Sequence, residues 1–321
     1  MNLNYTDSNS LKQVTVMSNI VVIGSVNTDM VIKTKHIPVP GETVLGGQFM
    51  ILGGGKGANQ AVAAARLGGK VSFVSKLGRD VFGEKMLQNL KNECINIDHI
   101  TIDPIQPSGV AMITVDDKGE NTIVVAPGAN ATLSITDVQN AIDVIKSSEI
   151  ILVQLEIPRE TVIEVVTIAK AYNIKVILNP APACELPDAL FKDLYLMTPN
   201  RKEAEMLSGI NINTLDEYDK AAAIIIQKGT KNLVITAGGS GAFVYTEEFT
   251  GQVPAQWVQA VDTTAAGDVF NGALAVALAQ QNSIKDAVAF ANRAAAISVT
   301  RMGAQASAPF LSELDVQLSS I

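Results

Sequence analysis

The feature that most constrains the fold is a regular alternation of short apolar runs and helical patterns between residues 135 and 236. The apolar runs are rich in Val, Ile and Leu, as buried parallel strands are. These runs fall at 150–154, 175–179, 194–197 and 232–236, and the helical patterns fall at 137–146, 159–172, 202–207 and 215–227. Such an alternation predicts a parallel sheet with helices on both faces.

The flanking regions extend this pattern in both directions. Residues 19–24 and 71–75 are typical of buried strands, and residues 58–66 and 82–93 are typical of helices. Two long helices close the chain, one from Asp268 and one from near Ser283. The expected architecture is a three-layer α/β domain over residues 18–321, with a Rossmann-like, mostly parallel sheet and helices on both faces.

Two strand-like segments, 27–51 and 109–126, interrupt the α/β order. Within the second segment, residues 109–115 and 121–126 alternate on either side of a polar turn, which predicts a β-hairpin. We expect the two segments to pair in space as a small β-sheet lid over the main domain.

Composition and length exclude several classes of protein. The 321 residues suffice for a sizeable core, and the net charge of −8 comes without a basic cluster, so we expect no nucleic-acid partner. No apolar run is long enough to span a membrane, so we expect no membrane association. Cys94 and Cys184 lack the spacing of a metal or redox motif, which favours the reducing cytoplasm. Residues 1–17 are polar and show no signal peptide; we expect a disordered N-terminal extension, unless Met17 is the true start.

The segment Asp262-Thr-Thr-Ala-Ala-Gly-Asp268 carries the strongest chemical signal. It precedes a long apolar helix, so the backbone N–H groups near Gly267 are the unpaired donors of a helix N-terminus. Glycine also lets a ligand approach the backbone closely. An anion site with Asp268 at its edge is a place to hold phosphate beside a base. An ordinary helix cap would explain Asp268 alone, but not the whole segment.

A glycine-rich segment, Gly53-Gly-Gly-Lys-Gly-Ala-Asn-Gln60, supplies further donors. It resembles a phosphate loop, but Gly57 stands where the Ser or Thr ligand of Mg²⁺ would be. Lys56 and Asn59 suit a polyhydroxylated ligand as well as an anion. A plain glycine-rich turn explains this segment about equally well when it is taken alone.

Polar side chains also follow the predicted strands. Asn27 and Asp29 share one face of an extended segment and could grip vicinal hydroxyls, although a polar loop edge is the simpler explanation. Ligands of parallel sheets gather at the carboxyl ends of strands, where Glu156 is expected. Asn200 and Glu203 could reach a Mg²⁺-phosphate through water, although Glu203 is also an ordinary first-turn glutamate.

Two further segments could bind a ligand, but each also has a simple structural explanation. Thr236-Ala-Gly-Gly-Ser-Gly241 follows a strand and could pass close to a nucleotide, or it could be a hairpin turn. Near Ser298 a long helix ends, with Gly303 in a plausible C-cap position. Carbonyls at a helix end can ligate a hard cation, and Ser307 can add a hydroxyl, but a plain helix terminus is the favoured interpretation there.

Taken in order, these motifs resemble those of the ribokinase family of carbohydrate kinases. The series Gly-Ser-Val-Asn-Thr-Asp, Gly-Gly-Lys-Gly-Ala-Asn-Gln, Asn-Pro-Ala-Pro, Asp-Thr-Thr-Ala-Ala-Gly-Asp and Ser-Val-Thr-Arg-x-Gly-Ala-Gln is very specific and covers nearly the whole chain after Met17. The resemblance implies an α/β domain with a β-sheet lid that also forms a homodimer interface. It implies transfer of the γ-phosphoryl group of ATP to the 5-hydroxyl of D-ribose, with Mg²⁺ bound to ATP and K⁺ as a monovalent activator.

The resemblance also implies roles for individual residues. Asp268 matches the catalytic base, and the anion hole matches Ala265, Ala266 and Gly267. The sugar contacts match Asn27, Asp29, Gly54, Lys56, Asn59 and Glu156, and the apolar lid positions match Ala111, Ile113 and Val125. The nucleotide and Mg²⁺ side matches Asn200, Glu203, Thr236, Gly238 and Gly241, with Asn292 as a candidate adenine contact. The K⁺ site matches Asp262 and Ser307 by side chain, and Thr264, Ser298, Arg301 and Gly303 by backbone carbonyl.

One position departs from the family pattern, and two alternative functions stay open. The family usually has Asn-Glu-x-Glu where Arg201 follows Asn200 here, so we expect Mg²⁺ use to survive with altered affinity for metal or inorganic phosphate. A kinase for another sugar or nucleoside, such as 2-deoxyribose, fructose or adenosine, would differ in few contacts. A non-catalytic sugar or nucleotide sensor is disfavoured by the intact Gly267 and Asp268. A dinucleotide dehydrogenase is weaker still, since no G-x-G-x-x-G follows the first strand.

Overall fold

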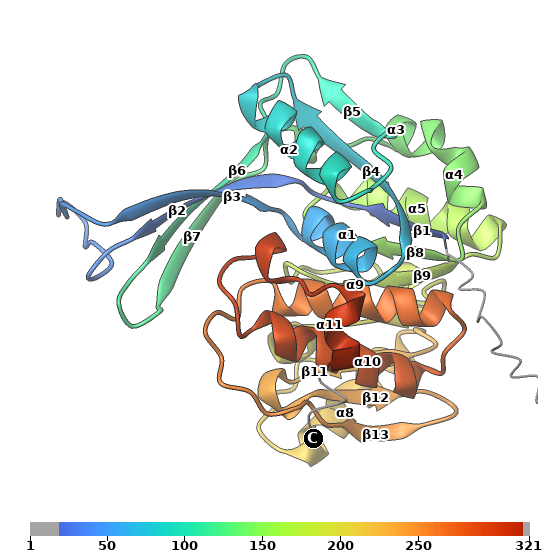
Figure 1. The fold of residues 1–321 in the computed structure, drawn as a ribbon. Helices are drawn as coiled ribbons and strands as arrows, with labels where there is room; N and C mark the ends of the chain where they lie inside the picture. The colour runs from blue at the N-terminus through green and yellow to red at the C-terminus, as the bar shows by residue number, and fades with distance from the viewer. Residues whose placement is uncertain (1–18, 317–321) are drawn as a thin grey trace, which may run out of the picture.

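The main sheet of the protein has nine strands. The structure, a computed structural model, describes residues 19–316, so the expected extension over residues 1–17 lies outside the described part. The strand order is β13-β12-β11-β10-β9-β8-β1-β4-β5, and all neighbours are parallel except β11–β12 and β12–β13 (Figure 1). The strands are β1 (Asn19–Ile23), β4 (Lys70–Gly78), β5 (Ile100–Asp103), β8 (Ile150–Val153), β9 (Lys175–Leu178), β10 (Leu196–Met197), β11 (Leu233–Thr236), β12 (Ala242–Tyr245) and β13 (Thr250–Val253).

Helices cover both faces of this sheet, as the alternation in the sequence predicts. One layer contains α1 (Lys56–Arg66), α2 (Val81–Asn92), α9 (Ala266–Ala279), α10 (Ile284–Ser298) and α11 (Leu311–Val316). The other contains α3 (Ile135–Asn140), α4 (Ile142–Lys146), α5 (Arg159–Ala171), α6 (Asp188–Phe191), α7 (Arg201–Ser208) and α8 (Leu215–Gln227). None of these helices, within residues 19–316, has the length and apolar character needed to span a bilayer.

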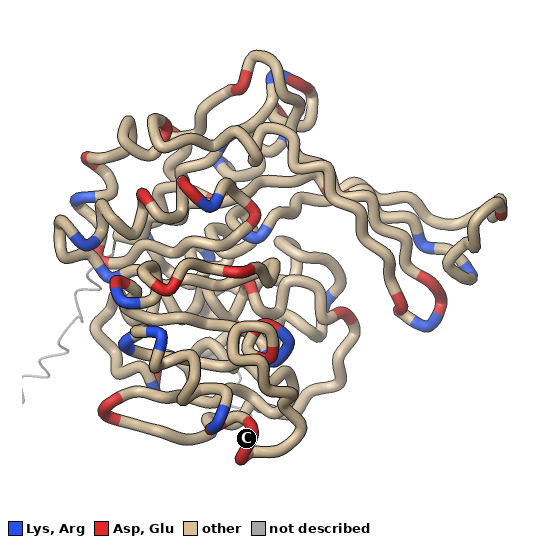
Figure 2. The backbone as a smooth tube through the Cα atoms, turned by 180° about the vertical axis from the view of Figure 1, so that it is seen from behind, with Lys and Arg blue, Asp and Glu red and all other residues tan. Residues whose placement is uncertain are grey.

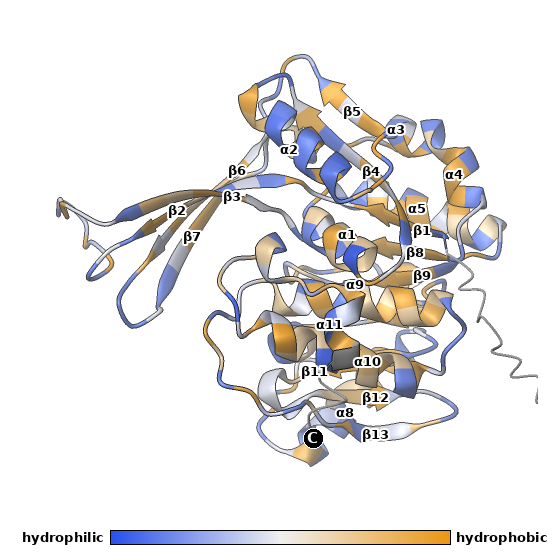
Figure 3. Cartoon of the chain, in the orientation of Figure 1, coloured by the Kyte–Doolittle hydropathy of each residue, from blue (hydrophilic) through white to orange (hydrophobic). Residues whose placement is uncertain are grey.

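The central strands serve two hydrophobic cores at once. In β1, Ile20 and Val22 belong to the core under α1 and α9, whereas Val21 and Ile23 belong to the core under α5. Successive side chains of a strand point to opposite faces, so a strand buried on both sides must be apolar throughout. Figure 3 shows the apolar strands between helices whose outer sides are more hydrophilic. The three-layer α/β fold predicted from the sequence is therefore confirmed.

A separate four-stranded sheet projects from the main body (Figure 1). Its order is β3-β2-β6-β7, with β2 (Asn27–Lys33), β3 (Gln48–Gly54), β6 (Gly109–Val115) and β7 (Asn121–Ala126). The two strand-like segments predicted to pair do so, through parallel β2–β6 pairing, and β6–β7 is the predicted hairpin. Figure 2 shows its charged residues mostly near the strand ends, while the body carries both signs of charge interspersed. A role as a lid stays a prediction.

The helices α1 and α9 pack with unusually little side-chain volume between them. A Cβ on Gly272 would lie 2.7 Å from both the Ala63 Cβ and the Gln60 carbonyl oxygen. Only glycine at this position allows α9 to approach α1 so closely. The consequence is that side chains on the first turns of both helices reach each other at the edge of the sheet.

Three local predictions need correction. The helix expected over 137–146 is two short helices, because the N–H of Ala141 bonds the Val138 carbonyl in a tighter turn. The helix expected from Asp268 begins two residues earlier, at Ala266, directly after Ala265 in the left-handed conformation. Gly303 is not the C-cap of α10, which ends at Ser298 in tight turns; Gly303 lies in the following loop at φ 89°.

Candidate active site

The carboxyl ends of the parallel strands meet the N-termini of α1 and α9 at one edge of the main sheet. Parallel strands all end on the same side, so the segments that follow β1, β8, β9, β10 and β11 lie together there. The polar residues in these segments include Glu156, Asn179, Asn200 and Thr236. The predicted sugar and nucleotide residues therefore come from different elements to one edge.

The carboxylate of Asp268 lies in the first turn of α9 and is 7% exposed. Each of its oxygens accepts one amide from α1: Asn59 Nδ2 at 2.9 Å and Gln60 Nε2 at 3.0 Å. Burial raises the pKa of Asp268 above its ordinary value, although the charge of Lys56 and these two hydrogen bonds act in the opposite direction. A buried carboxylate with a raised pKa is well suited to accept a proton.

Lys56 is the first residue of α1 and lies among carboxylates. Burial lowers the pKa of Lys56, but the charges of Asp268, Glu156 and Glu203 outweigh burial and raise it above its ordinary value. The ammonium group therefore stays charged. Glu156 Oε2 accepts hydrogen bonds from the Lys56 N–H at 3.0 Å and from Ser25 Oγ at 2.5 Å, which ties the end of β8 to α1.

Asp29 brings another carboxylate from β2 to within electrostatic reach of Glu156 and Asp268. Burial, together with the charges of Glu156 and Asp268, raises the pKa of Asp29 to about 7. No group in the described chain donates a hydrogen bond to this carboxylate to offset its burial. Glycine at position 54 leaves room for this carboxylate, because a Cβ there would clash with both Asp29 oxygens as they lie. Asp29 is an acceptor without a donor near Asp268, which suits ligand hydroxyl groups.

The neighbouring strands place apolar side chains beside Asp29. The register pairs Asp29 with Ala111 and Ala111 with Val125, so these three residues lie in one row across β2, β6 and β7. Ile113 lies two residues further along β6 and points to the same face. The predicted apolar lid positions therefore flank the carboxylate, with Ala111 buried and Val125 exposed.

Asn130, which the sequence analysis missed, fixes the start of β2. Its side chain accepts a hydrogen bond from Val26 N at 2.9 Å, and it donates to Val26 O at 2.9 Å and to Asn27 Oδ1 at 2.8 Å. The side chain of Asn27 is held in place at the start of β2 in this way and is 4% exposed. No local pattern marks Asn130, because its partners are 103 and 104 residues away in the chain.

The N-terminus of α9 supplies backbone donors beside Asp268. The N–H of Ala266 bonds the Thr263 carbonyl at 3.2 Å, whereas the N–H groups of Gly267 and Asp268 find no acceptor among the described residues. A Cβ on Gly267 would meet nothing within 4 Å, so a ligand has room at this point. The predicted anion hole is therefore open at Gly267, while the Ala266 donor is engaged within the loop.

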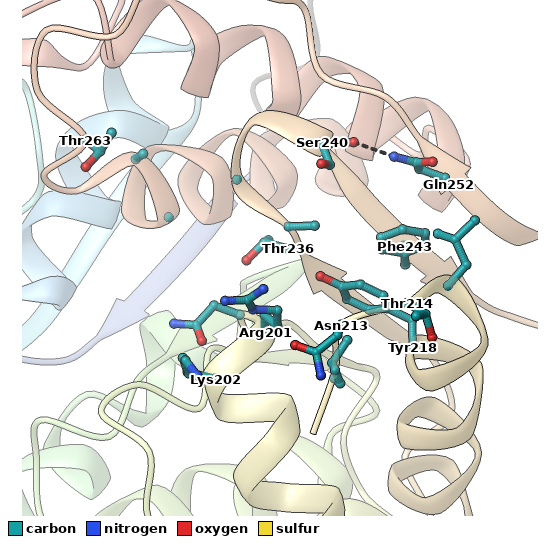
Figure 4. Close-up of a pocket in the computed structure, with 17 residues that line it drawn as sticks. Arg201, Lys202, Asn213, Thr214, Tyr218, Thr236, Ser240, Phe243, Gln252 and Thr263 are labelled. Atoms are coloured by element: carbon teal, nitrogen blue, oxygen red, sulfur yellow. Dashed lines mark hydrogen bonds between the residues drawn. The ribbon is translucent and has the colours of Figure 1, made fainter. Parts of the chain in front are cut away.

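Two pockets meet at this helix N-terminus. The larger has a volume of about 830 Å³ and is lined by Arg201, Tyr218 and Phe243 (Figure 4). The smaller has a volume of about 320 Å³ and contains Trp257, Gly241 and Asn292 in its wall. Residues common to both walls are Thr236, Gly238, Thr263, Ala266 and Gly267. A narrow apolar pocket that joins a roomier polar one at free N–H groups fits a nucleotide base and its phosphates.

Asn200 and Glu203 cap helix α7 at the wall of the larger pocket. The Asn200 N–H donates to Glu203 Oε2 at 2.8 Å, and the Glu203 N–H donates to Asn200 Oδ1 at 2.9 Å. Asn200 lines the pocket and Glu203 does not. Burial is the main cause that raises the pKa of Glu203, and Lys56 and Asp268 also act on it. Glu203 is thus an ordinary helix cap whose carboxylate also lies within electrostatic reach of Asp268.

Asn292 supports the smaller pocket from α10. Its Nδ2 donates to the carbonyls of Val253 at 2.9 Å and Pro254 at 3.3 Å, which braces the loop that carries Trp257. Trp257 is 86% exposed and is the only tryptophan of the chain. The sequence analysis missed Trp257, since no motif surrounds it.

The predicted K⁺ ligands lie in two loops that Asp262 connects. Asp262 Oδ1 accepts from the Thr264 N–H at 2.9 Å, and Oδ2 accepts from the Gly303 N–H at 2.8 Å. Burial acts to raise the pKa of Asp262, but these hydrogen bonds keep it below its ordinary value. The predicted carbonyl ligands, at Thr264, Ser298, Arg301 and Gly303, belong to the same loops or to the adjoining end of α10. A carboxylate and backbone carbonyls are the kinds of oxygen donor that a hard cation takes.

Known proteins resemble this chain over almost its whole length. Residues 17–311 match the pfkB family carbohydrate kinase profile. Ribokinase from Haemophilus influenzae is 44% identical over 90% of this chain and 94% of that protein. Deoxyribokinase from Salmonella typhi is 39% identical over 94% of this chain and 99% of that protein. The solved structure of Arabidopsis thaliana ribokinase with ribose and ATP superimposes with a TM-score of 0.87 and 29% identity, over 94% of this chain and 99% of that one.

The buried Asp29 carboxylate predicts a pH-dependent gain in stability on Asp29→Asn. The pKa of Asp29 in the folded protein is about 7, above its ordinary value of 3.8. The stability that the proton confers is therefore complete below pH 3.8 and is lost as the pH rises through 7. Asp29→Asn removes this loss. The free energy of unfolding of the variant should therefore exceed that of wild type by an amount that grows from pH 4 to pH 8 and reaches up to about 4 kcal/mol.

Urea unfolding at pH 5, 6, 7 and 8 measures this difference. Asp117→Asn, on the exposed turn between β6 and β7, is the matched control and should show no such trend. An advantage of Asp29→Asn that stays flat over this range would contradict the assignment.

Proposed function

Since the chain belongs to the pfkB family of carbohydrate kinases, we propose that it transfers the γ-phosphoryl group of ATP to the 5-hydroxyl of D-ribose. The observation that carries this proposal is the position of Asp268. Its carboxylate is bonded to α1 on the sugar side, and its own backbone N–H is free at the end of the nucleotide pockets. One residue thus borders both halves of the cleft, where a hydroxyl and a phosphoryl group would meet.

The residues divide the chemistry between a base and an anion hole. Asp268 would accept the proton of the 5-hydroxyl as that oxygen attacks the γ-phosphorus. The free N–H groups of Gly267 and Asp268 would hold the charge that grows on the transferred group. The charge of Lys56 acts against burial and lowers the pKa of Asp268, which favours the ionised form that can act as a base. Closure of the small sheet would exclude water, which otherwise competes as an acceptor.

The sugar side favours ribose over 2-deoxyribose. Asp29 has two acceptor oxygens and receives no hydrogen bond from the described chain. A vicinal diol can donate to both oxygens, whereas loss of one hydroxyl leaves a buried acceptor unpaired. The relative named ribokinase and the structure with bound ribose point the same way. The deoxyribokinase relative, at 39% identity, makes 2-deoxyribose the second candidate.

Mg²⁺ is the proposed metal partner of ATP. When bound, it would neutralise charge on the β- and γ-phosphates. Asn200 lines the phosphate end of the larger pocket, and the Glu203 carboxylate lies behind it. These groups fit an outer-sphere role through water, which Mg²⁺ commonly retains. Arg201 lines the same pocket and adds a positive charge for the phosphates.

K⁺ is the proposed monovalent activator. Asp262, Ser307 and the carbonyls of Thr264, Ser298, Arg301 and Gly303 would hold it. Because Asp262 and Thr264 belong to the loop that leads into α9, a cation there would set the direction of the Gly267 and Asp268 N–H groups without touching a substrate.

The outer face of the small sheet supports a homodimer. The register places Ile51, Met30, Met112 and Val124 in one row across its four strands, opposite to the row of Asp29. Three of these side chains are exposed, with Val124 at 71%. A second copy of the chain could cover this row, and sedimentation equilibrium would measure the dimer.

The cytoplasm is the proposed location of the enzyme, because ATP is the proposed phosphoryl donor and Cys94 and Cys184 are free thiols. Cell fractionation would test this.

A panel of acceptors tests the proposed reaction. We expect ADP release to depend on added sugar, with kcat/KM for D-ribose at least about tenfold above that for 2-deoxyribose, because the unpaired Asp29 oxygens reject the missing hydroxyl. Fructose and adenosine should be poorer still. Equal or better use of 2-deoxyribose would support the second candidate, and absence of sugar-dependent ADP release would overturn the kinase.

Asp268→Asn tests the base. The substitution keeps the size of the side chain but removes the proton acceptor, so single-turnover phosphorylation should slow by about 10³-fold or more. The sugar affinity, measured by calorimetry, should stay near that of wild type. Phosphorylation near the wild-type rate would remove Asp268 as the base.

Exchange of K⁺ for Na⁺ at constant ionic strength tests the monovalent site. We expect a lower kcat in Na⁺, because the smaller ion fits the carbonyl ligands less well. The Asp262→Asn variant should lose the difference between the two salts. Equal rates of the wild-type enzyme in both salts would contradict the K⁺ proposal.

A further inference from the structure

A closed ring of buried hydrogen bonds joins the carboxylate of Asp268 to the backbone N–H of the same residue. Gln60 Nε2, which donates to Asp268 Oδ1 at 3.0 Å, also donates to Asn179 Oδ1 at 3.1 Å. Asn179 Nδ2 donates to the Thr198 carbonyl at 3.1 Å, and Thr198 Oγ1 donates to Asn271 Oδ1 at 2.6 Å. Asn271 Nδ2 donates to the Gly267 carbonyl at 2.8 Å, and the Gly267–Asp268 peptide bond closes the ring.

Every side chain in this ring is buried. Gln60 is 0% exposed, Thr198 and Asn271 are each 1% exposed, and Asn179 is 7% exposed. Side-chain amides at this depth are costly to bury unless their groups are bonded. An apolar core would serve packing equally well at these positions, so their polarity calls for a reason beyond stability.

The directions of these bonds follow from the groups at the two ends of the ring, the Asp268 carboxylate and the Gly267 carbonyl. An ionised Asp268 only accepts, so Gln60 must turn its NH₂ group toward it. Gln60 Oε1 then accepts from Gln154 Nε2 at 2.5 Å, and the second Gln60 hydrogen goes to Asn179. On the other side, the Thr198 hydroxyl fixes Asn271 so that its NH₂ group faces the Gly267 carbonyl.

The bond at the Gly267 carbonyl also sets the anion hole. The atoms of a peptide unit lie in one plane, with the carbonyl and the following N–H pointing in opposite directions. Asn271 therefore fixes the direction of the Asp268 N–H, which is one of the two free donors at the start of α9. Gln60 fixes the carboxylate of the same residue from the other end of the ring.

We propose that Gln60, Asn179, Thr198 and Asn271 are positioning residues that lock the base and the phosphate-binding peptide into one rigid unit. The ring links α1, α9 and the segments after β9 and β10, so the proton acceptor and the phosphoryl donor site cannot shift independently. This inference rests on the proposed kinase reaction. It predicts that loss of one hydrogen bond of the ring, far from both substrates, slows phosphoryl transfer and leaves the binding of both substrates unchanged.

Thr198→Val is the principal test, because it removes one hydroxyl with little change in volume. We expect kcat to fall at least about tenfold, since small misplacements of reacting groups are costly, while the KM for each substrate changes less than about twofold. Thr198→Ser restores the hydroxyl and should recover most of the wild-type kcat. Quenching of the Trp257 fluorescence by ATP should give the wild-type affinity in all variants.

Thr161→Val is the matched control. Thr161 is equally buried on α5, and its hydroxyl also donates to a carbonyl, that of Leu133 at 2.7 Å, outside the ring. A loss of stability without a loss of kcat is expected there. The proposal is overturned if Thr198→Val keeps the wild-type kcat, or if both valine variants lose kcat to the same extent.

Gln60→Met supplies an independent readout at the other end of the ring. It removes a hydrogen bond to the ionised base, so the acid limb of the kcat profile should move upward by about one pH unit. The other charged groups that act on Asp268, namely Lys56, Glu156, Asp29 and Glu203, are unchanged in this variant. An unmoved acid limb would overturn the proposal even if Thr198→Val failed to fold. Wild-type enzyme without sugar-dependent ADP release would instead overturn the proposed function.

Discussion

The hydrogen bonds from Asn59 and Gln60 to the carboxylate of Asp268 are the interaction on which the rest of the site depends. A carboxylate that is 7% exposed would be strongly disfavoured without them. They exist only because α1 and α9 approach closely at Gly272, where a side chain would clash with Ala63. The two features therefore act together. Small residues along the helix contact bring α1 and α9 close, and the amides at the end of the contact stabilise the carboxylate charge.

In the proposed reaction the two substrates would meet opposite electrostatic environments. The proposed sugar side contains the acceptors Asp29, Glu156 and Asp268 around the ammonium group of Lys56. The nucleotide side presents donors: the free N–H groups at the start of α9 and the guanidinium of Arg201. A neutral molecule rich in hydroxyl donors matches the first side and a polyanion matches the second. This division disfavours binding of either substrate in the other's place.

The fold could be predicted from the sequence because its signals are local. Alternation of apolar strands and helices over residues 135–236 indicates the layers, and the strand ends indicate the edge where ligands gather. The motifs around Asp268 and Lys56 led to the residues that the structure brings together. The helix boundaries at Ala141 and Ala265 were not predicted. Each depends on the backbone conformation of one alanine, and alanine is a good helix former whose presence does not signal a helix end.

The partners that orient the site could not be predicted. Asn130 and Asn27 are 103 residues apart, and Gln60 and Asp268 are 208 apart. Buried Thr198 and Asn271 look like any polar residues until their strand and helix are placed in space. An amide has no periodic pattern to reveal its partner, so long-range polar contacts emerge only from the assembled fold.

The contact between α1 and α9 can form only late in synthesis of the chain. Nearly all of α1 is buried in the finished protein, yet its main partner begins at residue 266. Synthesis at about 5–20 residues per second separates the two helices by roughly 10 to 40 seconds on the ribosome. During that interval the face of α1 that packs on α9 lacks its partner, although β1 and β4, which also contact α1, are already made. The proposed active site around Asp268 is completed only by the last sixth of the polypeptide.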